Sequence, residues 1–160
     1  MIIKIDFKKL ILSLLPPVFV GGLASLITRG DMDLYEKIKK PPLAPPGIVF
    51  PIVWSVLYIL MGISFYLVWK EKKASYDEKK RAFTVYFISL FLNFIWSPVF
   101  FSLRQFLPAF IILVLLFISV AVYTTLYYNI GKAAGLLQIP YIIWLIVAAY
   151  LNLSIILLNG

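Results

Sequence analysis

The sequence has no cysteine and no histidine among its 160 residues. Without thiols it has no disulfide bond and no thiolate metal site, and without imidazoles it lacks histidine ligands for haem. The same absences exclude a serine or cysteine nucleophile that is activated by histidine. We therefore expect no metal site and no resident cofactor.

Charge is also scarce, because Asp, Glu, Lys and Arg together make up 14% of the chain. None of them falls in the middle of a long apolar stretch. Proton pumps and ion-coupled transporters usually carry such groups at depth in the membrane. The sequence thus argues against proton-coupled or ion-coupled transport, and it offers no ordinary acid–base pair inside the membrane.

Apolar residues, by contrast, are in excess. The chain is 62% hydrophobic, whereas soluble domains contain about 45–50%. A chain this short has too little interior to bury that excess, so we predict an integral membrane protein. The net charge of +8 fits this class, since Lys and Arg flank the apolar stretches, where anionic headgroups attract them. We expect the lipid bilayer, and no nucleic acid, as a partner.

The apolar residues form five stretches, each close to the roughly 20 residues that cross a hydrocarbon core. The sequence therefore predicts an all-α membrane protein, a single domain over residues 1–160 that forms a bundle of five transmembrane helices. The expected spans are residues 7–27, 48–69, 82–102, 107–129 and 134–158. We expect Pro16 and Pro17 to kink the first span and Pro98 to loosen the third.

Two connections between the spans are long. Residues 28–47 contain Pro41–Pro42 and Pro45–Pro46, which fix φ and remove backbone donors. This pattern predicts a stiff, mostly extended lid over one end of the bundle. Residues 70–81 are predicted to form a solvated, charged loop.

Lys and Arg are concentrated in the N-terminal segment, in residues 70–81 and near residue 132. A bundle of five spans places these three segments on one side of the membrane. The positive-inside rule then assigns that side to the cytoplasm. We therefore expect a multi-pass protein of the cell membrane with its N-terminus in the cytoplasm, and with its C-terminus and the 28–47 loop outside the cell.

Aromatic and amide side chains supply the remaining chemistry inside the spans. Trp54 and Tyr58, four residues apart, share one face of the second span. The third and fifth spans add Asn93, Trp96, Phe100, Tyr141, Trp144 and Asn152. An apolar pocket with a few placed polar groups is typical of a small-molecule site, and indole faces suit a flat, conjugated ligand.

Packing and interfacial positions are the alternative interpretation of these residues. Asn93 has two predicted uses, a hydrogen bond across helices or a hydrogen bond to a ligand. Trp69, directly before a run of charges, is predicted to be an interfacial belt residue. In the first span a small-residue patch allows another helix or a ligand to come close. It consists of Gly21, Gly22, Ala24 and Ser25.

Three motifs, in this order along the chain, carry a resemblance to a known family. They are KPPLAPPGIVFPIVWSVLY (residues 40–58), LFLNFIWSPVFF (residues 90–101) and PYIIWLIVAAYLN (residues 140–152). With them the sequence resembles the translocator protein family, also called tryptophan-rich sensory proteins or peripheral-type benzodiazepine receptors. The resemblance implies a five-helix bundle, often a homodimer, with the first loop capping a pocket.

The resemblance also implies ligands and the residues that contact them. Members of the family bind porphyrins such as protoporphyrin IX, haem, and synthetic drugs of the isoquinoline and benzodiazepine type, and animal members bind cholesterol. The pocket residues that the resemblance carries over are Ser25, Pro45, Pro46, Trp54, Tyr58, Asn93, Trp96, Phe100, Tyr141, Trp144 and Ala148.

The chain departs from the family pattern at a few positions. Tyr35 stands where the family usually has Trp, and Leu43 stands where it has Trp or Phe, so the resemblance implies a lid with less aromatic surface. The proposed cholesterol motif needs a Lys or Arg after Tyr150, and none follows. We therefore do not expect cholesterol to bind through that motif.

The sequence leaves three functions to compare. The favoured one is a receptor or carrier for tetrapyrroles and benzodiazepine-site drugs, in sensing or porphyrin homeostasis. The second is an enzyme-like breakdown of protoporphyrin IX that depends on light or oxygen, as reported for some bacterial members, with Trp54 and Trp144 as catalytic residues. The third is a structural membrane subunit that has no ligand.

Overall fold

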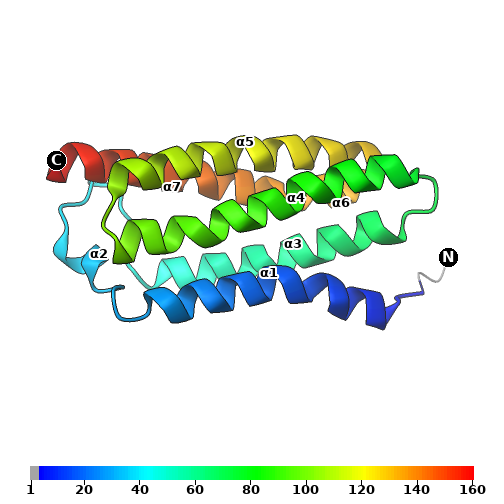
Figure 1. The fold of residues 1–160 in the computed structure, drawn as a ribbon, viewed down its shortest axis with the longest axis horizontal. Helices are drawn as coiled ribbons and strands as arrows, with labels where there is room; N and C mark the ends of the chain where they lie inside the picture. Colours follow the sequence, from blue (N-terminus) through cyan, green and yellow to red (C-terminus); the bar gives the residue numbers. More distant parts are fainter. Residues whose placement is uncertain (1–3) are drawn as a thin grey trace.

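A computed structural model describes residues 4–160 and consists of helices that lie along one common axis (Figure 1). Within this part of the chain, five helical segments are long and apolar enough to cross a membrane, which confirms the predicted all-α bundle. The long helices are α1 (Phe7–Thr28), α3 (Val49–Lys70), α4 (Tyr76–Ser97), α5 (Phe106–Ile130) and α7 (Ile139–Asn159). The short elements are α2 (Leu34–Lys37), the π-helical turn η1 (Pro98–Ser102) and α6 (Lys132–Leu136).

The long helices run side by side in alternating directions, so the start of α1 and the end of α7 lie at opposite ends of the bundle (Figure 1). Helix α1 packs against α3, while α5 packs against both α4 and α7. The connection over residues 29–48, which contains α2, covers the end where α7 finishes, and we call this the lid end. The α3–α4 connection lies at the other end, which we call the basic end.

The α3–α4 connection is shorter than the sequence predicted. The predicted loop over residues 70–81 is wrong for its second half, because α4 begins at Tyr76. The Ser75 hydroxyl accepts a hydrogen bond from the Glu78 backbone N–H, and the Glu78 carboxylate accepts one from the Ser75 N–H. This reciprocal capping box starts the helix among charged residues, where hydrophobicity alone gives no signal.

Prolines have different effects in different helices. Helix α1 continues through Pro16 and Pro17, so these prolines do not end the helix, and the kink expected there stays a prediction. Pro98, in contrast, begins a π-helical turn in which the Leu103 N–H donates to the Pro98 carbonyl at 2.9 Å, which confirms that the third span loosens there. The predicted fifth span is divided at residues 137–138, with Pro140 in the first turn of α7.

The lid is less extended than the proline pairs predicted. One helical turn, α2, lies within it, and the Ala44 N–H donates to the Pro41 carbonyl at 3.0 Å to form a turn. Large apolar side chains face outward along all the long helices, as expected of surfaces that contact lipid. The buried core is rich in aromatic rings, and those nearest the lid surround the candidate site.

Candidate ligand-binding site

A cavity of about 100 Å³ lies between α1, α3 and α4 near the lid end. Its wall consists of small residues from α1 on one side and large aromatic residues from α3 and α4 on the other. The lining residues are Gly21, Ala24, Ser25, Thr28, Met32, Phe50, Pro51, Trp54, Tyr58, Asn93, Trp96, Ser97 and Phe101. The cavity therefore brings together five of the predicted site residues, namely Ser25, Trp54, Tyr58, Asn93 and Trp96.

Asn93 connects three helices at the inner wall of this cavity. Its side-chain carbonyl accepts a hydrogen bond from the Tyr58 hydroxyl at 2.9 Å. Its amide nitrogen donates to the Tyr141 hydroxyl at 2.8 Å. An amide buried in an apolar bundle is costly without partners, and these two bonds supply them. The structure thus confirms the interhelical use of Asn93, which had been one of two predicted uses.

Trp54 forms an aromatic group with its neighbours on α3 and α7. Its ring stacks on Tyr58 with 5.6 Å between centroids and meets Tyr141 edge to face at 6.0 Å. The Tyr58 ring in turn lies against the backbone of α1, at a point where a Cβ on Gly21 would overlap it. Gly21 was visible in the sequence only as part of a small-residue patch, and the structure gives it this specific contact.

Trp96 separates the main cavity from a second void of about 20 Å³. The second void lies closer to α7, and its lining includes two further predicted residues, Phe100 and Ala148. The Trp96 indole N–H donates to the Asn152 side-chain carbonyl at 3.3 Å, and the Asn152 amide donates to the Phe106 backbone carbonyl at 2.9 Å. These bonds fix the wall between the two spaces.

Trp144 and Tyr141 do not line the main cavity. Trp144 is buried and meets Phe50 edge to face, with 5.5 Å between centroids, while Phe50 itself lines the cavity. Among the described residues the Trp144 indole N–H has no hydrogen-bond partner. The two tryptophans predicted to act together, Trp54 and Trp144, are therefore not exposed to the same space in this closed arrangement.

Phe101 also lines the main cavity, and sequence periodicity missed it. A regular α-helix that presents Asn93 inward predicts Phe100, seven residues later, on the same face. The π-helical turn at Pro98–Ser102 contains more residues than an α-helical turn, so it changes the register. As a result Phe101 joins the main cavity while Phe100 faces only the second void. Pro98 was the available signal for this change.

The lid folds around Tyr35, which is 5% exposed. Its hydroxyl donates to the Pro45 carbonyl at 2.7 Å, and its ring meets Phe50 edge to face with 4.9 Å between centroids. Lys40 approaches from outside, where its amine donates to the Tyr35 carbonyl at 2.6 Å and lies 4.6 Å from the ring centroid. Burial raises the pKa of the Tyr35 hydroxyl, so it remains a neutral donor at physiological pH.

Of the two predicted lid prolines, Pro45 thus holds the lid through its carbonyl, whereas Pro46 is exposed and lines neither cavity. Leu43, 82% exposed, also lies outside the site. The aromatic surface under the lid therefore comes from Tyr35 and Phe50.

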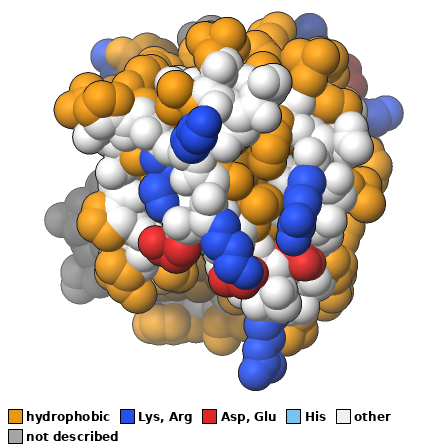
Figure 2. Space-filling view, turned by 90° about the vertical axis from the view of Figure 1, so that its left-hand side faces the viewer, with side chains coloured by type: hydrophobic (Ala, Val, Ile, Leu, Met, Phe, Trp, Pro, Cys, Tyr) orange, Lys and Arg blue, Asp and Glu red, His pale blue; other side chains and the backbone are white. Residues whose placement is uncertain are grey.

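The side chains of Asn159 and Ser102 attach the lid to the bundle by hydrogen bonds. The Asn159 side chain at the end of α7 accepts from the Lys39 N–H and donates to the Lys39 carbonyl, both at 3.0 Å. The Ser102 hydroxyl donates to the Asp31 carboxylate at 2.7 Å. Figure 2, which looks onto the lid end, shows basic and acidic side chains mixed across this face. The hydrogen bond from Lys37 lowers the pKa of Asp33 there.

A groove of about 510 Å³ opens between the end of α1 and the lid. It shares Ser25, Met32, Phe50, Pro51 and Phe101 with the main cavity, so it forms the outer approach to that cavity. Ligand sites for drug-sized molecules occupy about 300–1,000 Å³. The closed cavity is smaller than this, so a ligand of that size requires the groove wall and the lid to move outward.

These features define a multi-pass helical membrane protein with an aromatic cavity enclosed by a lid. Residues 13–158 match the model of the TspO/MBR family. The chain belongs to this family.

Similar proteins occur in an archaeon, in bacteria and in animals. The chain is 34% identical over 156 residues to the tryptophan-rich protein TspO of Archaeoglobus fulgidus. The aligned residues cover 97% of this chain and 99% of that protein. It is 35% identical to protein CrtK of Rhodobacter capsulatus, over 78% of each chain. It is also 35% identical to the human translocator protein, over 84% of this chain and 78% of that protein.

Proposed function

We propose that this protein is a membrane receptor or carrier for tetrapyrroles such as protoporphyrin IX and haem, and for drugs of the isoquinoline and benzodiazepine type. The single observation that carries the proposal is the cavity wall made by Trp54, Tyr58 and Trp96 beneath the Tyr35 lid. Flat aromatic walls favour flat, conjugated ligands through stacking. The names of relatives, among them a sensory protein and translocator proteins, are consistent with a role in sensing or carrying a small molecule.

The cavity floor also supports a ligand of this kind. The polar groups of Asn93 and Tyr58 have little free hydrogen-bonding capacity, because they bond to each other and Asn93 also bonds to Tyr141. The rings of a macrocycle would therefore leave few polar groups of the cavity without partners, and its carboxylates would lie in the access groove at Arg29, away from Asp33 and Glu36 of the same groove. We therefore expect the ligand to bind with its rings inside the cavity and its charged substituents under the lid.

Titration with protoporphyrin IX tests the proposal, with porphyrin absorbance as the readout so that removing a tryptophan does not remove the signal. We expect Trp54→Leu to weaken binding by about tenfold, because the stacking surface is lost. Trp69→Leu is the matched control, since this tryptophan lies in the same helix at the basic end. Equal affinity in Trp54→Leu and wild type would overturn the proposed site, and absence of binding in the wild type would favour the structural-subunit hypothesis.

A second candidate function is porphyrin breakdown that depends on light and oxygen. The observation that favours it is the contact of Trp54 with Tyr58 and Tyr141, because two oxidisable rings that line the cavity are then backed by a third. The porphyrin would absorb the light and dioxygen would be the oxidant, so the protein would supply position and electron-rich side chains. Within residues 4–160 the ring contact of Trp144 is with Phe50 and with none of these three rings, which makes Trp54 the first residue to test.

The measurement is the decay of bound porphyrin absorbance in light and in the dark. Catalysis predicts faster decay in wild type than for free porphyrin in the same detergent, and slower decay in Trp54→Phe at matched occupancy. Decay at the rate of the free porphyrin excludes this function and leaves the receptor or carrier proposal intact.

A further inference from the structure

A second groove lies at the basic end of the bundle, far from the candidate ligand site. It has a volume of about 620 Å³ and runs between the end of α3 and the start of α4. Its lining consists of aromatic and small residues with two lysines, Lys79 and Lys80, and contains no carboxylate. Both α3 and α4 are candidate membrane spans, and Tyr76 and Phe87 of the groove are exposed, so we expect the groove to face the lipid and its headgroups.

The groove changes from cationic to apolar along the helix axis. Lys79, Phe83 and Phe87 are spaced by four residues on α4, so they follow one face of the helix over about 12 Å. Phe83 is held in place by stacking on Phe65, with 4.2 Å between ring centroids. Phe87 continues the face toward the membrane interior and is 46% exposed. This order of charge and apolar surface matches that of a phospholipid, from its phosphate to its acyl chains.

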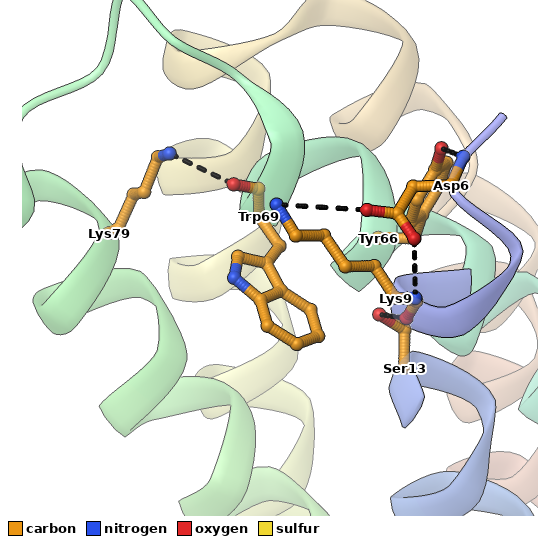
Figure 3. A network of polar contacts seen from close by, with 6 residues as sticks. All are labelled: Asp6, Lys9, Ser13, Tyr66, Trp69 and Lys79. Atoms are coloured by element: carbon orange, nitrogen blue, oxygen red, sulfur yellow. Dashed lines mark hydrogen bonds and ion pairs between the residues drawn. The ribbon is translucent and has the colours of Figure 1, made fainter. Parts of the chain in front are cut away.

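Trp69 forms the α3 side of the groove, between cations from two other helices (Figure 3). The Lys79 amine donates to the Trp69 backbone carbonyl at 3.0 Å. On the other side, the Lys9 amine of α1 lies 5.6 Å from the centroid of the Trp69 ring. Tryptophan is preferred at the level of the lipid headgroups, so Trp69 marks the depth at which a phosphate would lie.

The lysines of the groove retain unused hydrogen-bonding capacity. An ammonium group has three donors, and Lys79 uses one of them on Trp69. Within residues 4–160, the Lys80 amine makes no hydrogen bond and no ion pair. Among the nearby carboxylates, Glu78 caps α4, and Asp77 lines a neighbouring groove together with Lys80 but forms no ion pair with it. No ion pair in the described part of the chain therefore neutralises Lys79 or Lys80.

We propose that this groove binds an anionic phospholipid of the bilayer, with its phosphate at Lys79 and Lys80 and an acyl chain along Phe83 and Phe87. Basic pockets between transmembrane helices favour anionic headgroups in this way. A zwitterionic choline headgroup would bring its own cation beside the lysines. A soluble phosphate compound would leave the aromatic floor without an apolar partner.

The test is native mass spectrometry of the full-length protein in detergent, with phosphatidylglycerol and phosphatidylcholine that carry the same acyl chains. We expect wild type to retain phosphatidylglycerol about tenfold more strongly than phosphatidylcholine, since each lysine near the phosphate adds attraction. The variant with both Lys79→Gln and Lys80→Gln should lose most of this preference. The variant with both Lys72→Gln and Lys73→Gln is the control, because it removes the same charge from exposed lysines that do not line the groove.

Each outcome decides for or against the site. Loss of preference only in the Lys79 and Lys80 variant supports it, whereas an equal loss in both variants assigns the preference to net charge and overturns it. Glycerol 3-phosphate that competes as effectively as the lipid would show a free phosphate site instead, and an absence of preference in wild type also refutes the proposal. If the double variant does not fold, Lys80→Gln alone is used, because among residues 4–160 the Lys80 amine has no hydrogen bond or ion pair to lose. This variant should still reduce the preference by about threefold.

Discussion

Two residues at the cavity wall, Asn93 and Gly21, each determine how neighbouring helices pack. Asn93 is the clearest case, since its amide joins α3 to α7 from within α4. Its cost in an apolar environment had suggested either an internal partner or a ligand, and the structure supplies two internal partners. Gly21 acts in the opposite way, because its missing side chain makes room for the Tyr58 ring.

Asn93→Ala is expected to destabilise the protein by about 1–3 kcal/mol, because it leaves the Tyr58 and Tyr141 hydroxyls without their partner. Thermal unfolding in detergent measures this change. Asn129→Ala is the control, as this asparagine is exposed near the end of α5, and its variant should unfold with wild type. Equal melting temperatures for Asn93→Ala and wild type would show that the buried bonds contribute nothing net.

Gly21→Ala and Gly22→Ala form a matched pair on adjacent positions of α1. An added Cβ at Gly21 overlaps the Tyr58 ring, whereas the space around Gly22 is open. We expect Gly21→Ala to cost about 1–3 kcal/mol through overpacking and to weaken porphyrin binding. Gly22→Ala should be neutral or stabilising by up to about 1 kcal/mol, as alanine favours the helix. Unfolding and porphyrin titration of both variants test this, and similar behaviour of the two would contradict the contact.

At the scale of elements, the lid is the part of the molecule that must move for a large ligand to enter. It is held by contacts of several kinds: the Tyr35–Pro45 hydrogen bond, the Tyr35–Phe50 ring contact, and the Asn159 and Ser102 attachments to the bundle. Most of these contacts are polar, and they are fewer than the packing contacts between the helices beneath. The lid can therefore open without disturbing the transmembrane helices.

Tyr35→Phe keeps the ring against Phe50 but removes the hydrogen bond to the Pro45 carbonyl. We expect the porphyrin dissociation rate to rise by about fivefold to tenfold, since a net hydrogen bond contributes about 1 kcal/mol. Stopped-flow displacement measures this rate. Tyr150→Phe, on the exposed surface of α7, is the control.

The same experiment has a pH dependence with a definite sign. Burial raises the pKa of Tyr35 above its ordinary value of 10.0 in the folded lid. The hydrogen bond is then fully present below that ordinary value and is lost as the pH rises through the higher folded value. Wild-type dissociation should be constant through neutral pH and faster only in strong base. A change near neutral pH would show that another group controls the lid.

On the scale of the whole molecule, the fold places the basic end and the lid end on opposite faces of the membrane. The positive-inside rule assigns the basic end to the cytoplasm, and the proposed orientation follows from it. The absence of native cysteine makes this directly testable.

We expect a cysteine at Leu43 to react with a membrane-impermeant thiol reagent on intact cells, because this lid residue is 82% exposed. A cysteine at Lys72, in the α3–α4 connection, should react only after the membrane is opened. Labelling of the two sites in permeabilised cells is the control for reactivity. The reverse pattern would invert the proposed orientation.

Much of this molecule follows from local sequence. The five spans, their approximate limits and the loosening at Pro98 were predictable, because hydrophobic length and proline chemistry act over neighbouring residues. The start of α4 was missed although the Ser75 and Glu78 pattern was present, since the charged run around it was interpreted as a loop. Of the predicted site residues, those on α3 and α4 met at one cavity, while Tyr141, Trp144 and Ala148 on α7 lie behind it.

Apolar length and the scarcity of charge specify a membrane bundle with aromatic faces, because the hydrocarbon core selects for apolar length and excludes charge within it. Which aromatic residues share a cavity, and what closes it, depends on how the helices pack. Those choices depend on how each helix is rotated, which the π-helical turn changes, and on contacts such as that between Lys39 and Asn159, which are 120 residues apart. Pro98 signals the π-helical turn, but the final rotation of each helix and a contact across 120 residues do not follow from local sequence, so both appear only when the helices pack.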